Sequence, residues 1–187
     1  MCVCVCVCVC LGYVVVFMKT VSYNVRGLGG CEKKVEVRRL LGDKKPFVVC
    51  LQESKLGVVD DRQVMAIWGD SSVGYSFQPS RGASGGLLTA LDRRFVDVWS
   101  TSSFPHVLVI RGRVLETNHE FVLANVYAPY DTTEKQVLWN QLLLFIDNNR
   151  EVNLCVCGDF NYVRFVNERK GRGVVFCQHD TYIFNKS

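Results

Sequence analysis

The chain alternates short apolar runs with stretches in which apolar residues recur every three or four positions. Continuous apolar runs are typical of strands buried on both faces, and the longer spacing is typical of helices with one apolar face. The pattern predicts alternating strands and helices at both ends of the chain, around a strand-rich middle part. The predicted strands are 17–23, 47–51, 74–78, 86–91, 95–99, 107–115, 121–127 and 152–157, and the predicted helices are 32–42, 60–68 and 131–148.

The predicted helix at 131–148 has the clearest signals. Asp131 can cap its first turn, and Glu134 follows three residues later, which is the spacing of a capping box. Apolar residues then repeat at helical spacing. The helix at 32–42 is expected to end before Pro46, because proline cannot continue a helix.

This order of elements fits two β-sheets packed face to face with helices on the outside, which is an α/β architecture. At 187 residues the chain fits one domain with a sizeable core. No linker divides it, and no repeat of solenoid length stands out. We therefore divide the chain into a low-complexity leader, residues 1–17, and one domain, residues 18–187.

The leader is uncharged, and its residues 2–10 alternate cysteine with valine. Its length is marginal for a membrane span, and it lacks the basic segment and the cleavage site of a secretory signal. We interpret it as a low-complexity start without a function. Attachment to a membrane through residues 1–18 is the minority alternative.

Ten cysteines would suggest a disulfide framework in a secreted protein. Here five belong to the leader, and Cys50, Cys155 and Cys157 lie in predicted strands, where a thiol packs as a small apolar group. No C-x-x-C pair supports a zinc site. We expect a reducing compartment, either nuclear or cytoplasmic. The net charge of +4 permits a polyanionic partner without requiring one.

Four predicted strands each run into a polar residue of a kind that serves in catalysis. The first two lead to Asn24 and Glu53. The last two lead to Tyr127, and to Asp159 with Asn161. Because the ends of several strands can meet at one sheet edge, where loops leave room for a ligand, we expect these five side chains to face one pocket.

These five residues suit phosphodiester hydrolysis. Mg²⁺ prefers oxygen ligands, usually takes one or two carboxylates and keeps several waters. Glu53 supplies such a ligand, and Asn24 can support it. Asp159 can accept a proton from an attacking water, while Asn161 and Tyr127 can donate hydrogen bonds to the phosphate or hold that water.

Around these residues the sequence resembles the endonuclease/exonuclease/phosphatase superfamily. The similarity is closest to the endonuclease of plant LINE-type non-LTR retrotransposons and covers about residues 18–185. Ser84-Gly85-Gly86 and Glu168-Arg169-Lys170-Gly171 also resemble that subgroup. The four motifs are Ser22-Tyr23-Asn24-Val25-Arg26-Gly27-Leu28, Leu51-Gln52-Glu53-Ser54-Lys55, Asn125-Val126-Tyr127-Ala128-Pro129 and Gly158-Asp159-Phe160-Asn161.

The resemblance implies a four-layered α/β sandwich, with two mixed sheets flanked by helices, and Mg²⁺-dependent nicking of DNA, with Mn²⁺ as an alternative ion. It assigns the metal to Glu53 with Asn24 beside it. It places Tyr127 on the phosphate, and Asp159 and Asn161 around the nucleophile. It also implies a reverse transcriptase domain in the same polypeptide, which is absent from these 187 residues.

The resemblance further implies strands beyond this point, including a terminal Ser-Asp-His motif whose histidine contacts the scissile phosphate. The chain stops at Ser187 without that motif, and His179-Asp180 has the wrong order to replace it. We therefore expect a sandwich that is incomplete at the C-terminus, with weak or no activity.

Other interpretations stay open. The same scaffold supports phosphatases or phosphodiesterases of inositol phosphates or lipids, and the chain can also be a non-enzymatic retrotransposon relic. Asn24 can close a turn, and Ser84-Gly85-Gly86 is expected to be structural, as a tight approach into a strand. A basic loop after the last motif either is solvated or contacts DNA phosphates. Its residues are Arg164, Arg169, Lys170 and Arg172.

Overall fold

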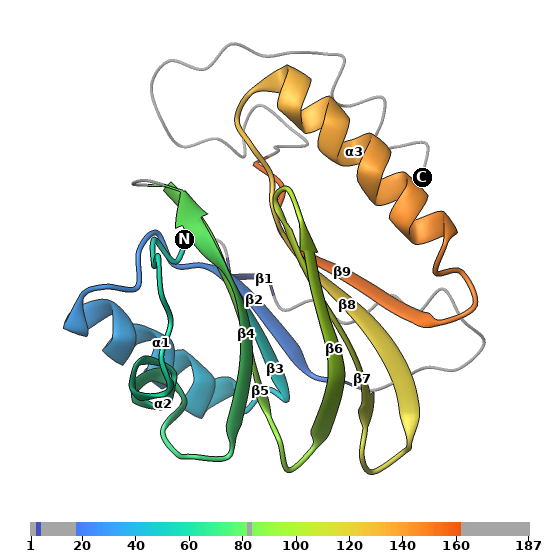
Figure 1. Ribbon diagram of the computed structural model, residues 1–187. Coiled ribbons are helices and arrows are strands. Elements are labelled where there is room, and N and C mark those ends of the chain that lie inside the picture. The colour runs from blue at the N-terminus through green and yellow to red at the C-terminus, as the bar shows by residue number, and fades with distance from the viewer. Residues whose placement is uncertain (1–2, 5–17, 82–83, 162–187) are drawn as a thin grey trace.

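Two β-sheets lie face to face in the computed structural model, with helices on both outer sides (Figure 1). The structure describes residues 3–4, 18–81 and 84–161. The layers run from α1 and α2, through a five-stranded and a four-stranded sheet, to α3 (Figure 1). The predicted α/β sandwich with two mixed sheets and flanking helices is confirmed.

The first sheet has the strand order β1-β2-β3-β5-β4. Strands β2 and β3 are parallel and the other neighbours are antiparallel, so the sheet is mixed. Because Asn24 pairs with Gln52, the carboxyl ends of β2 and β3 leave the sheet side by side. The elements are β1 (Val3–Cys4), β2 (Thr20–Asn24), α1 (Cys31–Lys44), β3 (Val48–Gln52), α2 (Asp61–Trp68), β4 (Val73–Arg81) and β5 (Ser84–Asp92).

The second sheet has the order β6-β7-β8-β9, in which only β8 and β9 are parallel. Helix α3 makes the crossover between these two strands and covers the outer face. In this register Tyr127 pairs with Asp159, so these two strands also end together. The elements are β6 (Val96–Phe104), β7 (Val107–Val114), β8 (His119–Tyr127), α3 (Thr132–Asp147) and β9 (Asn153–Asp159).

Three apolar clusters fill the spaces between the four layers. Along β3, Val49 and Leu51 pack toward α1 and α2, whereas Val48 and Cys50 pack between the sheets. Burial on both faces explains why the predicted strands are continuous apolar runs. Cys50, Cys155 and Cys157 all lie in the cluster between the sheets, which agrees with the prediction that they serve as small apolar groups.

The helix signals are confirmed in detail. The carboxylate of Asp131 accepts a hydrogen bond from the Glu134 amide at 2.9 Å and so caps α3. Helix α1 ends at Lys45, whose left-handed backbone (φ 45°) turns the chain immediately before Pro46. Within the described residues, no helix is long and apolar enough to cross a membrane.

Most boundaries differ from the prediction by a few residues, and two of the differences matter here. Strand β6 continues to Phe104, although its second half is largely polar and exposed, because an edge strand with one solvated face tolerates serine and threonine. The polar loop expected from Gly158 onward begins later, since Gly158 and Asp159 belong to β9. The rest of that loop lies outside the described residues after Asn161, as does nearly all of the leader.

A group of buried polar contacts crosses the apolar space between the sheets. Nε2 of Gln52 on β3 donates to Oδ1 of Asn125 on β8 at 2.7 Å, and the two residues are 1% and 0% exposed. A buried amide without partners costs about 1–3 kcal/mol, so both must be satisfied. The two amide nitrogens donate further to Ser22 Oγ, Cys50 O, Leu51 O, Leu88 O and Thr89 Oγ1.

We predict that breaking this bridge from one side costs more than removing it whole. Gln52→Leu leaves Oδ1 of Asn125 without its donor, and Asn125→Leu removes the acceptor of Gln52 together with the bonds of its own amide nitrogen. Each should lower the free energy of unfolding by about 2–3 kcal/mol. The double variant should lose clearly less than the sum. Urea unfolding followed by circular dichroism measures all three. As a control, Asn140→Leu removes an exposed amide on α3 and should change the free energy by less than about 0.5 kcal/mol. Simple additivity of the two single effects would contradict the role of the bridge.

Candidate active site

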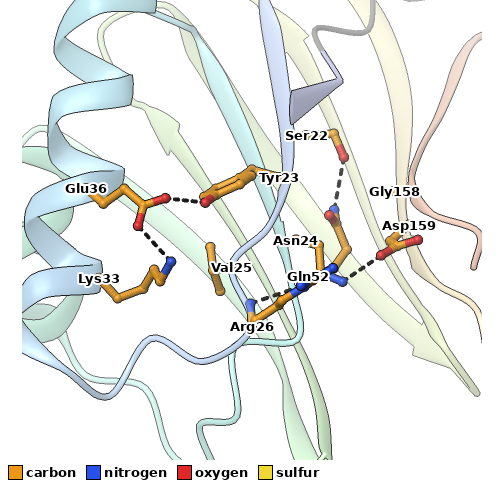
Figure 2. Close-up of a pocket in the computed structure, with 10 residues that line it drawn as sticks. All are labelled: Ser22, Tyr23, Asn24, Val25, Arg26, Lys33, Glu36, Gln52, Gly158 and Asp159. Carbon is orange, nitrogen blue, oxygen red and sulfur yellow. Dashed lines mark hydrogen bonds and ion pairs between the residues drawn. The ribbon is translucent and has the colours of Figure 1, made fainter. Parts of the chain in front are cut away.

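The two parallel strand pairs end at the same edge of the sandwich, and a side-chain hydrogen bond joins them across the sheets. Nδ2 of Asn24, at the end of β2, donates to Oδ2 of Asp159, at the end of β9, at 2.6 Å (Figure 2). These residues are 135 positions apart in the sequence. Both line a cavity of about 370 Å³, together with Arg26 and Gln52 (Figure 2).

Both side-chain ends of this pair have fixed orientations. Oδ1 of Asn24 accepts from the Arg26 amide at 3.0 Å, and Oδ1 of Asp159 accepts from the Asn161 amide at 2.9 Å. The side chain of Asn161 in turn donates to the Ala128 carbonyl at 2.5 Å. The predicted residues Asn24, Asp159 and Asn161 therefore form one connected hydrogen-bonded group.

Glu53 follows β3 directly in a left-handed conformation (φ 55°), which turns its side chain away from the strand direction. Its carboxylate is 16% exposed and lies 3.3 Å from Nζ of Lys55. Two backbone hydrogen bonds fix the chain at Glu53. The carbonyl of Glu53 accepts from the Gly27 amide at 2.7 Å, and the amide of Ser54 donates to the Gly86 carbonyl at 3.0 Å. Glu53 is thus tied to the Asn24 motif on one side and to β5 on the other.

The pKa of the Tyr127 phenol is affected by both carboxylates. Burial is the main cause that raises the pKa of Tyr127, and the negative charge of Glu53, the neighbouring Tyr130 and the charge of Asp159 raise it further. Tyr127 pairs with Asp159 in the register of β8 and β9. At neutral pH the phenol stays a hydrogen-bond donor. Of the five predicted residues, Asn24 and Asp159 line the cavity of Figure 2, whereas Tyr127 lines a second cavity, and Glu53 and Asn161 line neither of the two.

The donor set fits a hard divalent cation. Glu53, Asp159 and the amide of Asn24 offer oxygen atoms, and a cation such as Mg²⁺ takes one or two carboxylates and fills its other positions with water. In the part of the chain that the structure describes, no group of three or more His, Cys, Asp or Glu side chains could hold a metal.

Two glycines allow this geometry. A Cβ on Gly158 (φ 150°) would lie 1.9 Å from the Val126 carbonyl oxygen on β8. Only glycine therefore fits at this position, directly before Asp159. A Cβ on Gly86 (φ 85°) would lie 2.5 Å from Oγ of Ser54, the residue after Glu53. The expected structural role of Ser84-Gly85-Gly86 is therefore confirmed at Gly86.

The sequence pattern missed two contributors. The role of Gln52 as a buried bridge was not expected, although a polar residue inside an apolar run was the available signal. Lys135 on α3 was also missed; it is 7% exposed and its Nζ donates to the Asn161 carbonyl at 3.1 Å. The candidate DNA contacts Arg164, Arg169, Lys170 and Arg172 lie outside the described residues.

A family model described as the Endonuclease/Exonuclease/phosphatase family matches residues 21–173, and the chain belongs to this family. An exodeoxyribonuclease of Bacillus subtilis (strain 168) is 25% identical over 151 residues, which are 77% of this chain and 58% of that protein. Nucleases of this family generally use a divalent metal ion.

Solved structures of two AP endonucleases share the fold. The enzyme from Leishmania major is 18% identical with a TM-score of 0.65, over 89% of this chain and 64% of that one. The enzyme from Archaeoglobus fulgidus is 18% identical with a TM-score of 0.64, over 89% of this chain and 68% of that one. The chain thus spans about three fifths to two thirds of the length of these three proteins.

We predict that Gly86→Ala disturbs the candidate metal site at Glu53 and that Gly85→Ala does not. Both glycines have positive φ (85° and 77°), so each substitution should cost about 1–2 kcal/mol of backbone strain in urea unfolding. Only the Cβ at position 86 meets Ser54, whereas that at 85 has open space around it. Gly86→Ala should therefore also weaken Mn²⁺ binding, measured by electron paramagnetic resonance. Equal Mn²⁺ affinity in the two variants would contradict the coupling between Gly86 and Glu53.

We predict that Glu53→Gln lowers the pKa of Tyr127, because it removes a negative charge that disfavours the phenolate. Carbon-13 NMR of labelled tyrosine rings, with the signal assigned by Tyr127→Phe, measures this. The folded-state pKa lies above that of the unfolded chain, so the contribution of Tyr127 to stability is complete below pH 10 and falls as the pH rises beyond it. Glu116→Gln, an exposed carboxylate in a turn, is the control. If Glu53→Gln leaves the pKa of Tyr127 unchanged, the carboxylate of Glu53 does not act on the phenol of Tyr127, and the prediction is wrong.

Proposed function

We propose that this chain carries the catalytic edge of a metal-dependent phosphodiesterase that acts on DNA. The observation that carries the proposal is the hydrogen bond between Asn24 and Asp159, since it joins two family motifs from different sheets at one cavity. The relatives support DNA as the substrate, because the Bacillus subtilis protein is named an exodeoxyribonuclease and two of the solved structures are AP endonucleases.

In this proposal Glu53 holds the metal, Mg²⁺ or Mn²⁺, and Asn24 supports it. The ion would neutralise charge that develops on the phosphate and on the leaving oxygen. Asp159 accepts the proton of the attacking water, and its position is fixed by Asn24 on one oxygen and by Asn161 on the other. Tyr127 stays protonated because of its raised pKa and donates to a phosphate oxygen.

A narrower proposal follows from the motif similarity. We infer descent from the endonuclease of a plant LINE-type retrotransposon, with a reverse transcriptase as the partner domain of the parent polypeptide. The basic residues Arg164, Arg169, Lys170 and Arg172 would then contact phosphates of the bound DNA, because guanidinium and ammonium groups neutralise the backbone without reading sequence.

The test is nicking of supercoiled plasmid with the protein in excess, so that a slow reaction is measurable. We expect nicking that requires Mg²⁺ or Mn²⁺ and stops with a chelator. Glu53→Gln and Asp159→Asn should each reduce the rate about 100-fold or more, since each removes a group that acts on the reacting atoms.

Two controls define the outcome. Glu116→Gln changes an exposed carboxylate in a turn and should nick at the wild-type rate. Release of phosphate from an inositol phosphate measures the alternative substrate. Nicking that survives in Glu53→Gln, or phosphate release without nicking, would refute the proposal.

A further inference from the structure

A second cavity has Tyr127 in its wall. Its volume is about 490 Å³, within the roughly 300–1,000 Å³ of small-molecule sites. The second half of β4, the start of β5, the turn between β6 and β7, the end of β8 and the first turn of α3 line it, and Tyr127 and Ala128 belong to its wall. Because Tyr127 also belongs to the catalytic edge, a group bound in this cavity lies next to the bond that the edge would cleave.

The wall of this cavity is rich in rings. Pro79, Pro105 and Pro129 line it, and Tyr130 stands beside them with 75% of its surface exposed. An aromatic ring of that exposure loses favourable burial unless something covers it. Tyr130 also raises the pKa of Tyr127 through a side-chain hydrogen bond, so the two phenols are adjacent.

The charges in the cavity argue against a phosphate there. Among the described residues that line it, Glu134 is the only acidic one and none is lysine or arginine. A phosphate would meet a carboxylate, with the imidazole of His106 as the one basic side chain among the described lining residues. A flat, uncharged ring meets proline rings and a phenol, which are the partners on which nucleic-acid bases stack.

We propose that this cavity binds an unpaired nucleobase of the DNA strand, next to the scissile phosphate, with Tyr130 as the stacking platform. This inference rests on the proposed function for the position of the phosphate. It makes the substrate preference specific: single-stranded or locally unpaired DNA is favoured over a fully matched duplex, because a base must leave its pair to enter the cavity.

The test is binding of a short single-stranded DNA oligonucleotide that carries 2-aminopurine, whose fluorescence falls when it stacks on an aromatic ring. The protein is the full chain with Ca²⁺ in place of Mg²⁺. Wild type and Tyr130→Phe should quench the fluorescence at one position of the strand. Tyr130→Leu, which keeps an apolar side chain without a ring, should lose the quenching and bind at least about 5-fold more weakly.

Trp99→Leu is the matched control, because it removes another exposed aromatic ring, 52% exposed, on β6. It should leave quenching and affinity unchanged. Circular dichroism should show that Tyr130→Leu keeps its fold, as expected for an exposed side chain. Equal quenching in Tyr130→Leu and wild type would overturn the proposal, as would an equal loss in Trp99→Leu.

The nicking assay separates this inference from the proposed function. If metal-dependent nicking occurs and Tyr130→Leu loses the preference for unpaired over matched DNA, both stand. If nicking occurs with the same preference in Tyr130→Leu and wild type, only the base site is refuted. If quenching depends on Tyr130 but no metal-dependent nicking occurs, the base site stands and the proposed function fails.

Discussion

The hydrogen bond between Gln52 and Asn125 is the constraint on which the rest of the structure depends. Apolar contacts between two sheets are not directional, so they allow the sheets to slide by small amounts. A pair of buried amides has a defined geometry and costs free energy when it is misaligned. The bridge therefore selects one alignment of β3 against β8 within an otherwise apolar layer.

The alignment of β3 against β8 also positions the candidate site, because the site residues follow the bridge within a few residues. Glu53 directly follows Gln52, and Tyr127 lies two residues beyond Asn125. Because parallel pairing carries the same positions to the neighbouring strands, Asn24 and Asp159 arrive opposite each other and form their own hydrogen bond. The stiff interior of the sandwich thus positions groups that lie at its edge, where a substrate can enter.

Much of the fold and of the site was predictable because both depend on local patterns. All eight predicted strands and three predicted helices correspond to observed elements, since burial on one or two faces leaves a periodic trace. The five candidate residues were singled out because each lies at or just after the end of an apolar run. The exposed half of β6 was not found, because a solvated edge strand lacks that trace, and Lys135 was not found, because its partner is a distant backbone carbonyl.

By itself the sequence determined the layer architecture, the capped helix α3 and the identity of the polar residues at the strand ends. Only the tertiary structure decided that Gln52 and Asn125 bridge the sheets, that Asn24 bonds to Asp159, and that Tyr130 stands beside a cavity next to Tyr127. The physical reason is that periodicity reports which face of an element is buried. Contacts between residues some 70 or 135 positions apart depend on how whole sheets align, and no local pattern carries that information.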